Sequence, residues 1–311
     1  MQTWFARLGV SAREKSGPRY DSYFRYRDKF IVEPLFLLMM ALNVMGCLDS
    51  AFYYPDRVLY DTPTRLGLNF RNVSFASSDG TRLSGWFIPA EGYDNPKDAK
   101  ATIIHFHGNA QNMSSHWMFV SWLPRRGFNV FVFDYRGYGN SQGRPEPKGI
   151  YEDSHSALNY VRSLQDVDPE RLIVFGQSLG GTIAIAVVGS GNRAGVRAVA
   201  IESTFYSYSS IANDKFSGAG FLVDNTYSAE KYIARIAPIP LLLIHGTSDP
   251  VIPYAHSIKL FAKAREPKTL ITVESGGHTE ALTSRFGSKY QDALTNFFET
   301  SIAASSGSSV R

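Results

Sequence analysis

The stretch Arg171-Leu-Ile-Val-Phe-Gly176-Gln177-Ser178-Leu179-Gly180-Gly181 decides the fold that the rest of the chain adopts. Residues 171–175 are mostly branched or aromatic and apolar, a composition typical of a buried strand. Residues 182–188 are also apolar and predict the opening of a helix. The sequence therefore predicts a strand, a sharp turn and a helix, with a Gly-x-Ser-x-Gly motif at the turn.

This turn predicts an exposed hydroxyl group at Ser178. A turn of this kind strains the serine backbone and lifts the hydroxyl above the sheet. A Cβ atom at Gly176 or Gly180 would collide with the neighbouring strand or helix. The helix N-terminus and the Leu179 N–H then face any negative charge that develops beside Ser178. The alternative is a glycine-rich turn with an incidental serine, and the position between these two elements favours the catalytic interpretation.

Composition narrows the class of protein. The chain has 311 residues, 44% hydrophobic and 19% charged, which is typical of a globular protein of one large or two small domains. Of the net charge of +4, most comes from the segment before Cys47, which holds seven basic and four acidic residues. No basic stripe remains for nucleic acid. A single cysteine excludes an internal disulfide and a cysteine-based metal site, and no histidine pair has metal-ligand spacing.

The N-terminal part contains an apolar run over 35–47 that is shorter than the roughly 20 residues needed to span a bilayer. It ends in Val44-Met45-Gly46-Cys47, which resembles the lipidation box of bacterial lipoproteins, although Met45 is bulky for it and the leader is long. Cys47 is thus a lipidation candidate. The alternatives are an uncleaved anchor or a buried helix with an incidental cysteine. We expect residues 1–53 to be a leader or membrane anchor with a linker, on an extracytoplasmic protein.

The remaining chain predicts an α/β fold. A hairpin is expected over 72–88, with Ser78-Asp79-Gly80 as its turn. Beyond it, short apolar strands alternate with helices, as expected for a mostly parallel sheet covered on both faces. These strands are expected at 102–106, 128–133, 171–175, 198–201, 241–244 and 269–273. The folded domain is expected over 54–302, followed by a flexible tail over 303–311.

A serine nucleophile needs a base, and the base needs a group that orients it. His278 lies in a glycine-containing segment directly after the predicted strand 269–273, and Asp249 follows the strand 241–244. Both are thus expected at the edge of the sheet that carries Ser178.

Other candidates for these roles are weaker. Glu202, which follows the strand after the serine turn, remains an alternative acid. Asp134 ends a strand before the serine turn, the wrong place for the acid. His105 alternates within a strand as core residues do, while His155 and His256 are expected on helix surfaces.

The loop 107–112 follows the strand 102–106 and contains Gly108. The backbone N–H of Asn109 is expected to join that of Leu179 as an oxyanion hole for a developing alkoxide. The alternative is a plain turn.

Five motifs in this order resemble the α/β-hydrolase superfamily over about residues 70 to 300, and more narrowly its abhydrolase-domain lysophospholipases and protein depalmitoylases. They are His107-Gly-Asn-Ala, Asp134-Tyr-Arg-Gly-Tyr-Gly-Asn-Ser141, Gly176-Gln-Ser-Leu-Gly-Gly181, His245-Gly-Thr-Ser-Asp249 and Gly276-Gly-His278. The resemblance implies an α/β-hydrolase fold. No cofactor is expected, because Gly176-Gln-Ser-Leu-Gly-Gly181 lacks the Gly-x-Gly-x-x-Gly phosphate turn of dinucleotide-binding proteins. The resemblance also implies Ser178 as nucleophile, His278 as base, Asp249 as its orienter, and Asn109 and Leu179 as oxyanion donors, with the segment from Asp134 a structural loop.

Many relatives of this kind carry a cap domain, but the interval 204–240 is too short for one and predicts a few short helices over the site. We expect a serine hydrolase that cleaves carboxylic esters or thioesters of a small-molecule or lipid substrate through an acyl-enzyme. A serine peptidase of the same fold and a non-catalytic binding protein are the alternatives.

Overall fold

The computed structural model describes residues 53–307. Its strands are β1 (Tyr54–Pro55), β2 (Arg71–Ala76), β3 (Arg82–Ile88), β4 (Thr102–Phe106), β5 (Ala110–Gln111), β6 (Asn129–Asp134), β7 (Leu172–Gln177), β8 (Val196–Glu202), β9 (Leu241–Gly246) and β10 (Lys268–Val273). Its α-helices are α2 (Met113–His116), α3 (Pro147–Ser163), α4 (Leu179–Gly189), α5 (Tyr208–Lys215), α6 (Ala229–Tyr232), α7 (Ala255–Lys263) and α8 (Lys289–Gly307). The 3-10 turns are η1 (Pro63–Leu66), η2 (Pro96–Asp98), η3 (Trp117–Phe119), η4 (Pro124–Arg126), η5 (Ala219–Leu222), η6 (Ile233–Arg235) and η7 (Ser284–Phe286).

Eight strands form the central sheet, in the order β10-β9-β8-β7-β4-β6-β3-β2. The strands from β10 to β6 are parallel to their neighbours, whereas β2 and β3 form an antiparallel hairpin that joins the sheet beside β6. The Ser77 N–H donates to the Thr81 carbonyl over 2.8 Å and closes the hairpin turn. The predicted mostly parallel sheet with an N-terminal hairpin is confirmed.

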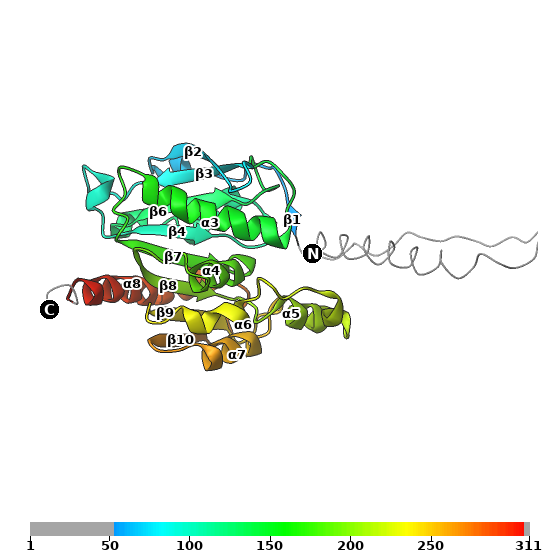
Figure 1. Cartoon of the computed structure of the whole chain (residues 1–311). Coiled ribbons are helices and arrows are strands. Elements are labelled where there is room, and N and C mark those ends of the chain that lie inside the picture. The colour runs from blue at the N-terminus through cyan, green and yellow to red at the C-terminus, as the bar shows by residue number, and fades with distance from the viewer. Residues whose placement is uncertain (1–52, 308–311) are drawn as a thin grey trace, which may run out of the picture. The chain divides into compact units, whose positions relative to one another are not determined.

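Helices cover both faces of this sheet (Figure 1). On one face α3, α4, α6 and α7 pack with Ile104 and Phe106 into one core cluster. On the other face α8 and the segment α2–η3 pack into a second cluster, which includes Trp117 and Phe298. Because both faces are covered, β4, β6, β7 and β9 are buried along their whole length rather than at alternate positions, whereas the edge strand β2 is mostly exposed.

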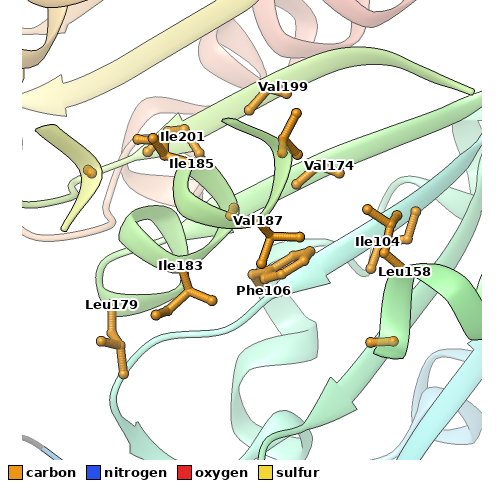
Figure 2. Packing of buried hydrophobic residues seen from close by; sticks show 14 of the residues in the cluster. Ile104, Phe106, Leu158, Val174, Leu179, Ile183, Ile185, Val187, Val199 and Ile201 are labelled. Atoms are coloured by element: carbon orange, nitrogen blue, oxygen red, sulfur yellow. The ribbon is translucent and has the colours of Figure 1, made fainter. Parts of the chain in front are cut away.

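The serine turn lies near the middle of the sheet. Gly176 of β7 pairs with Phe106 of β4 on one side and with Ile201 of β8 on the other. All residues of α4 are buried, since α3 and α6 flank this helix and the sheet lies beneath it. Figure 2 shows Ile183 and Val187 of α4 among the apolar side chains of β4, β7 and β8.

The interval 204–240 forms the short elements α5, η5, α6 and η6, as expected, and no separate domain. At the C-terminus, α8 continues to Gly307, well into the segment that was expected to be a flexible tail. This end of the helix is rich in alanine and serine, whose intrinsic helix propensity is compatible with continuation from a packed helix.

The predicted anchor over 35–47, including Cys47, lies outside the described residues and stays a prediction. Among the helices of residues 53–307, none is both long and apolar enough to cross a bilayer.

A buried ion pair fixes the loop after β6. The Arg136 side chain is 7% exposed, and its Nη2 lies 2.7 Å from Oδ1 of Asp153, which is fully buried in α3. Arg136 Nε and the Arg136 backbone N–H both donate to the other carboxylate oxygen, over 3.0 Å and 2.8 Å. The arginine thus holds this loop against α3, in agreement with the structural role that the resemblance implies.

Asp153 is fully buried, whereas Asp79, which lies 3.0 Å from Arg136 Nη1, is 42% exposed. Loss of a buried charge partner costs about 3–5 kcal/mol, and we expect Asp153→Asn to lower the free energy of unfolding in urea denaturation by up to this amount, because Asp79 compensates part of the arginine charge. The adjacent Glu152 pairs with Lys148 at the surface over 3.5 Å. Glu152→Gln is thus the matched control and should cost at most about 0.5 kcal/mol. Equal losses in the two variants would contradict the structural role of Arg136.

Candidate active site

Ser178 lies on a strained turn between β7 and α4, with φ 53° and ψ −121°. A Cβ at Gly180 would lie 2.1 Å from the carbonyl oxygen of Phe106, and one at Gly176 would lie 2.6 Å from the carbonyl oxygen of Gly180. Both positions therefore require glycine. The turn is held from β8, because the Ser178 N–H donates to the Glu202 carbonyl over 2.9 Å.

His278 lies on the loop after β10, with Nε2 3.0 Å from Ser178 Oγ. The loop is tied to the end of β8, since the Thr279 N–H donates to Ser203 Oγ over 3.2 Å and the Ala281 N–H donates to Glu202 Oε1 over 3.0 Å. The structure therefore brings together the two residues that the sequence assigned to nucleophile and base.

Asp249 lies on the loop after β9, with Oδ2 2.8 Å from His278 Nδ1. Its other oxygen accepts hydrogen bonds from the N–H groups of Val251 and Ile252, over 2.8 and 2.9 Å. Burial alone would raise the pKa of Asp249, but hydrogen bonds from His245 and His278 outweigh it and lower the pKa below its usual range. The ionised carboxylate accepts the Nδ1 proton of His278, so Nε2 is free to accept the proton of Ser178.

From the sequence, no role was assigned to His245, although this residue belongs to the same motif as Asp249. It is fully buried, and its Nε2 lies 2.9 Å from the Ile252 carbonyl and 3.2 Å from Asp249 Oδ2. Because a carbonyl only accepts, Nε2 carries the proton, and Nδ1 accepts from Ser257 Oγ over 2.6 Å. His245 therefore orients the carboxylate that orients His278. The sequence signal for this role is that a histidine, His245, lies four residues before Asp249.

Three other histidines contact groups other than Ser178. His105 is buried in the sheet and contacts Gln177 Oε1 over 2.9 Å, as expected for a core residue. His155 is half-buried and contacts the Asn192 side chain. The expectation that His256 is a surface residue is wrong, because it is buried between α5 and α7. Its Nδ1 accepts from the Tyr206 N–H and its Nε2 contacts Asp214 of α5, so it joins two helices.

The two other acidic candidates have structural partners instead. Asp134 accepts from the Met113 N–H over 2.7 Å. Glu202 is buried and accepts from Gln177 Nε2 over 2.6 Å as well as from the Ala281 N–H. No hydrogen bond joins Glu202 to His278 within the described chain, whereas Asp249 makes one. The geometry thus favours Asp249 over Glu202 as the orienting acid.

The two predicted oxyanion donors lie on either side of Ser178. Leu179 begins α4, and Asn109 follows the close approach of Gly108, where a Cβ would lie 3.6 Å from Ser178 Cβ. Within residues 53–307, the backbone N–H groups of Asn109 and Leu179 donate to no protein acceptor. The Asn109 carbonyl accepts from the Tyr138 hydroxyl over 2.8 Å, which fixes the loop. Both N–H groups are therefore available to an external acceptor.

A cavity of about 470 Å³ opens beside Ser178. Its lining is mostly apolar and comes from α5, η5, the loop after β9 and the N-terminal strand β1. The lining residues are Tyr54, Asn109, Ser178, Leu179, Phe205, Ile211, Ala212, Lys215, Phe216, Ala219, Val223, Val251 and Ile252. Such a cavity accepts an apolar group next to the serine hydroxyl.

Comparison with known proteins shows the family of this chain. Residues 97–226 match the family model described as "Serine aminopeptidase, S33". The chain is 34% identical over 76% of its length to "Alpha/beta hydrolase domain-containing protein WAV2" of Arabidopsis thaliana, covering 81% of that protein. The chain belongs to the α/β-hydrolase superfamily. This hydrolase is also 52% identical to "Uncharacterized protein YfhR" of Escherichia coli (strain K12), over 79% of its own chain and 85% of that one.

Solved structures share the fold of this hydrolase at low sequence identity. The Pyrococcus furiosus esterase Pf2001 has a TM-score of 0.65 at 19% identity, over 80% of this chain and 98% of that one. Acetyl xylan esterase 1 from Thermoanaerobacterium sp. JW/SL YS485 has a TM-score of 0.60 at 18% identity, over 85% of this chain and 92% of that one. These likenesses bear on the fold and not on the substrate.

Glu202 of the hydrolase predicts a pH dependence of stability. Burial raises its pKa from 4.5 to about 7, against the opposing hydrogen bonds from Gln177 and Ala281. Between pH 4.5 and about pH 7, Glu202 keeps its proton in the folded state and loses it in the unfolded state. The free energy of unfolding therefore falls as the pH rises through this range.

Glu202→Gln resembles the protonated side chain and removes this penalty. Relative to the wild type, we expect the variant to gain up to about 3 kcal/mol of unfolding free energy between pH 4.5 and pH 8, measured by urea denaturation. Titration of groups that do not interact with Glu202 cancels in this difference. A difference that does not change with pH would contradict the raised pKa of Glu202.

Proposed function

We propose that this hydrolase cleaves carboxylic esters or thioesters through an acyl-enzyme formed on Ser178. The proposal rests on one continuous series of contacts: Ser178 Oγ to His278 Nε2 over 3.0 Å, and His278 Nδ1 to Asp249 Oδ2 over 2.8 Å. A serine hydroxyl is a weak nucleophile unless a base of this kind removes its proton.

In the proposed reaction, His278 takes the proton of Ser178 as Oγ attacks the carbonyl carbon of the substrate. The N–H groups of Asn109 and Leu179 bind the resulting oxyanion. His278 then donates its proton to the departing alcohol or thiol. Water repeats the sequence on the acyl-enzyme and releases the carboxylic acid, while Asp249 stabilises the imidazolium in both halves.

The cavity supports an acyl substrate over a peptide. A serine aminopeptidase, the activity named in the matching family model, must bind a protonated α-amino group. The one charged side chain that lines the described cavity is Lys215, a cation, and the remaining lining is mostly apolar. This arrangement disfavours an ammonium group and favours an alkyl chain.

Removal of the proposed nucleophile, or of the acid that orients His278, gives the direct test. We expect Asp249→Asn to reduce kcat for p-nitrophenyl butyrate by about ten-thousand-fold, and Ser178→Ala by about a million-fold, as for the acid and the nucleophile of other triads. Wild type, but not Ser178→Ala, should be labelled by a fluorophosphonate probe.

Glu202→Gln is the control for the acid and should reduce kcat far less than Asp249→Asn. Unchanged turnover in Ser178→Ala would refute the proposed mechanism. A greater loss in Glu202→Gln than in Asp249→Asn would move the role of the acid to Glu202. Faster turnover of amino-acid p-nitroanilides than of esters by the wild type would favour the aminopeptidase.

Ala212 provides a test of the acyl site, because it is buried in α5 and lines the cavity. Ala212→Phe places a ring in this space, so the ratio of decanoate to butyrate ester turnover should fall at least about tenfold, as expected when a longer alkyl chain loses its apolar contacts. The measurement is a chain-length profile of p-nitrophenyl esters for both proteins. An unchanged profile would indicate that the acyl chain lies elsewhere.

A further inference from the structure

We propose that the mouth of the cavity docks on a lipid bilayer through an apolar rim formed by Phe216, Phe221, Leu222 and Val251. These side chains are 76%, 84%, 40% and 41% exposed, respectively. Large apolar side chains that gather at an opening, rather than being scattered over the surface, mark an interaction site.

The rim is continuous with the cavity. Phe216 and Val251 belong to the lining themselves, and the exposed Phe221 and Leu222 lie on η5 between the lining residues Ala219 and Val223. An alkyl chain that leaves the cavity therefore passes directly onto an apolar surface.

Local hydrogen bonds hold the rim in this exposed position. The Ala219 N–H donates to the Phe216 carbonyl over 2.9 Å, and the Gly220 N–H donates to Asn213 Oδ1 over 2.7 Å. At the other side of the mouth, Lys215 Nζ donates to the Val251 carbonyl over 2.7 Å. An ordered turn thus holds Phe221 exposed to solvent, while the inner face of α5 packs on the core.

The course of the chain identifies a bilayer as the occupant. Tyr54 lines the same cavity, and its N–H donates to Asn109 Oδ1 over 3.3 Å, so the N-terminal strand β1 lies at the mouth. The apolar run 35–47 ends seven residues before Tyr54. At about 3.5 Å per residue, this connection spans at most about 25 Å. An anchor formed by the run would therefore hold Tyr54, which lines the cavity, within that distance of the membrane.

This surface gives the proposed function a source of substrate. If the hydrolase acts on acyl esters, a lipid chain reaches Ser178 from the bilayer without passing through water. Docking itself is independent of the reaction and is tested separately.

Site-specific fluorescence tests docking in the full chain. Phe221 and Met118 are each replaced, in separate variants, by an amino acid whose side chain is an environment-sensitive fluorescent dye, introduced by amber suppression, so that Cys47 and the N-terminal segment stay unchanged. Met118 is 43% exposed on η3, which belongs to the segment covering the opposite face of the sheet, and is the matched control. With phosphatidylcholine–phosphatidylglycerol vesicles, the dye at position 221 should shift to the blue and be quenched by doxyl-labelled lipid, and the dye at position 118 should not.

Two results would overturn docking. One is a dye at position 221 that behaves like the dye at position 118. The other is a blue-shifted dye at position 221 that lipid quenchers do not reach, because protein then covers the rim.

Turnover provides the second measurement. Phe221→Ser combined with Leu222→Ser should reduce hydrolysis of a long-chain ester embedded in vesicles at least tenfold, and leave p-nitrophenyl butyrate turnover within about twofold. Met118→Ser should change neither. Equal loss on both substrates would contradict a role in docking. Absence of ester turnover in the wild type would refute the proposed function instead, and the fluorescence result would stand.

Discussion

The hydrogen bond from the Ser178 N–H to the Glu202 carbonyl is the contact on which the whole site depends. It continues the parallel pairing of β7 with β8, in which Gln177 lies opposite Glu202, so the sheet itself sets the height of the serine. Ser178 itself has a positive φ, and this conformation costs a non-glycine residue about 1–3 kcal/mol. The Thr204 hydroxyl binds the Ser178 carbonyl over 2.7 Å and helps to offset this strain.

The same end of β8 also positions the loop that carries His278. Ser203 accepts the Thr279 N–H, and the Glu202 carboxylate accepts the Ala281 N–H. Glu202, the last residue of β8, therefore contacts both the serine turn and the histidine loop, and the next two residues contact one of them each: Ser203 the histidine loop and Thr204 the serine turn. The separation of Ser178 Oγ from His278 Nε2 is set by this short segment, and not by two loops that vary independently.

Sequence reasoning located the features that local pattern or strand direction determines. Glycine spacing predicted the serine turn, and apolar runs predicted the strands. Asp249 and His278 were found because the carboxyl ends of parallel strands meet at one edge of the sheet.

His256 was misplaced because its burial depends on Asp214, 42 residues earlier on α5, and no local pattern reveals this contact. The role of His245 was missed for a related reason, since it depends on how the loop after β9 folds back over that strand. The length of α8 beyond the expected boundary shows that a serine- and alanine-rich segment is ambiguous until its packed helix is known.

The cavity walls and the reacting groups come from different parts of the chain. α5 and η5 supply much of the apolar lining, whereas Ser178, Asp249 and His278 follow strands of the sheet. Under the proposed mechanism, substitutions in this one short segment would therefore change which compounds enter the cavity while the three proposed catalytic groups stay in place. Such a separation would let substrate preference evolve without loss of activity along the way.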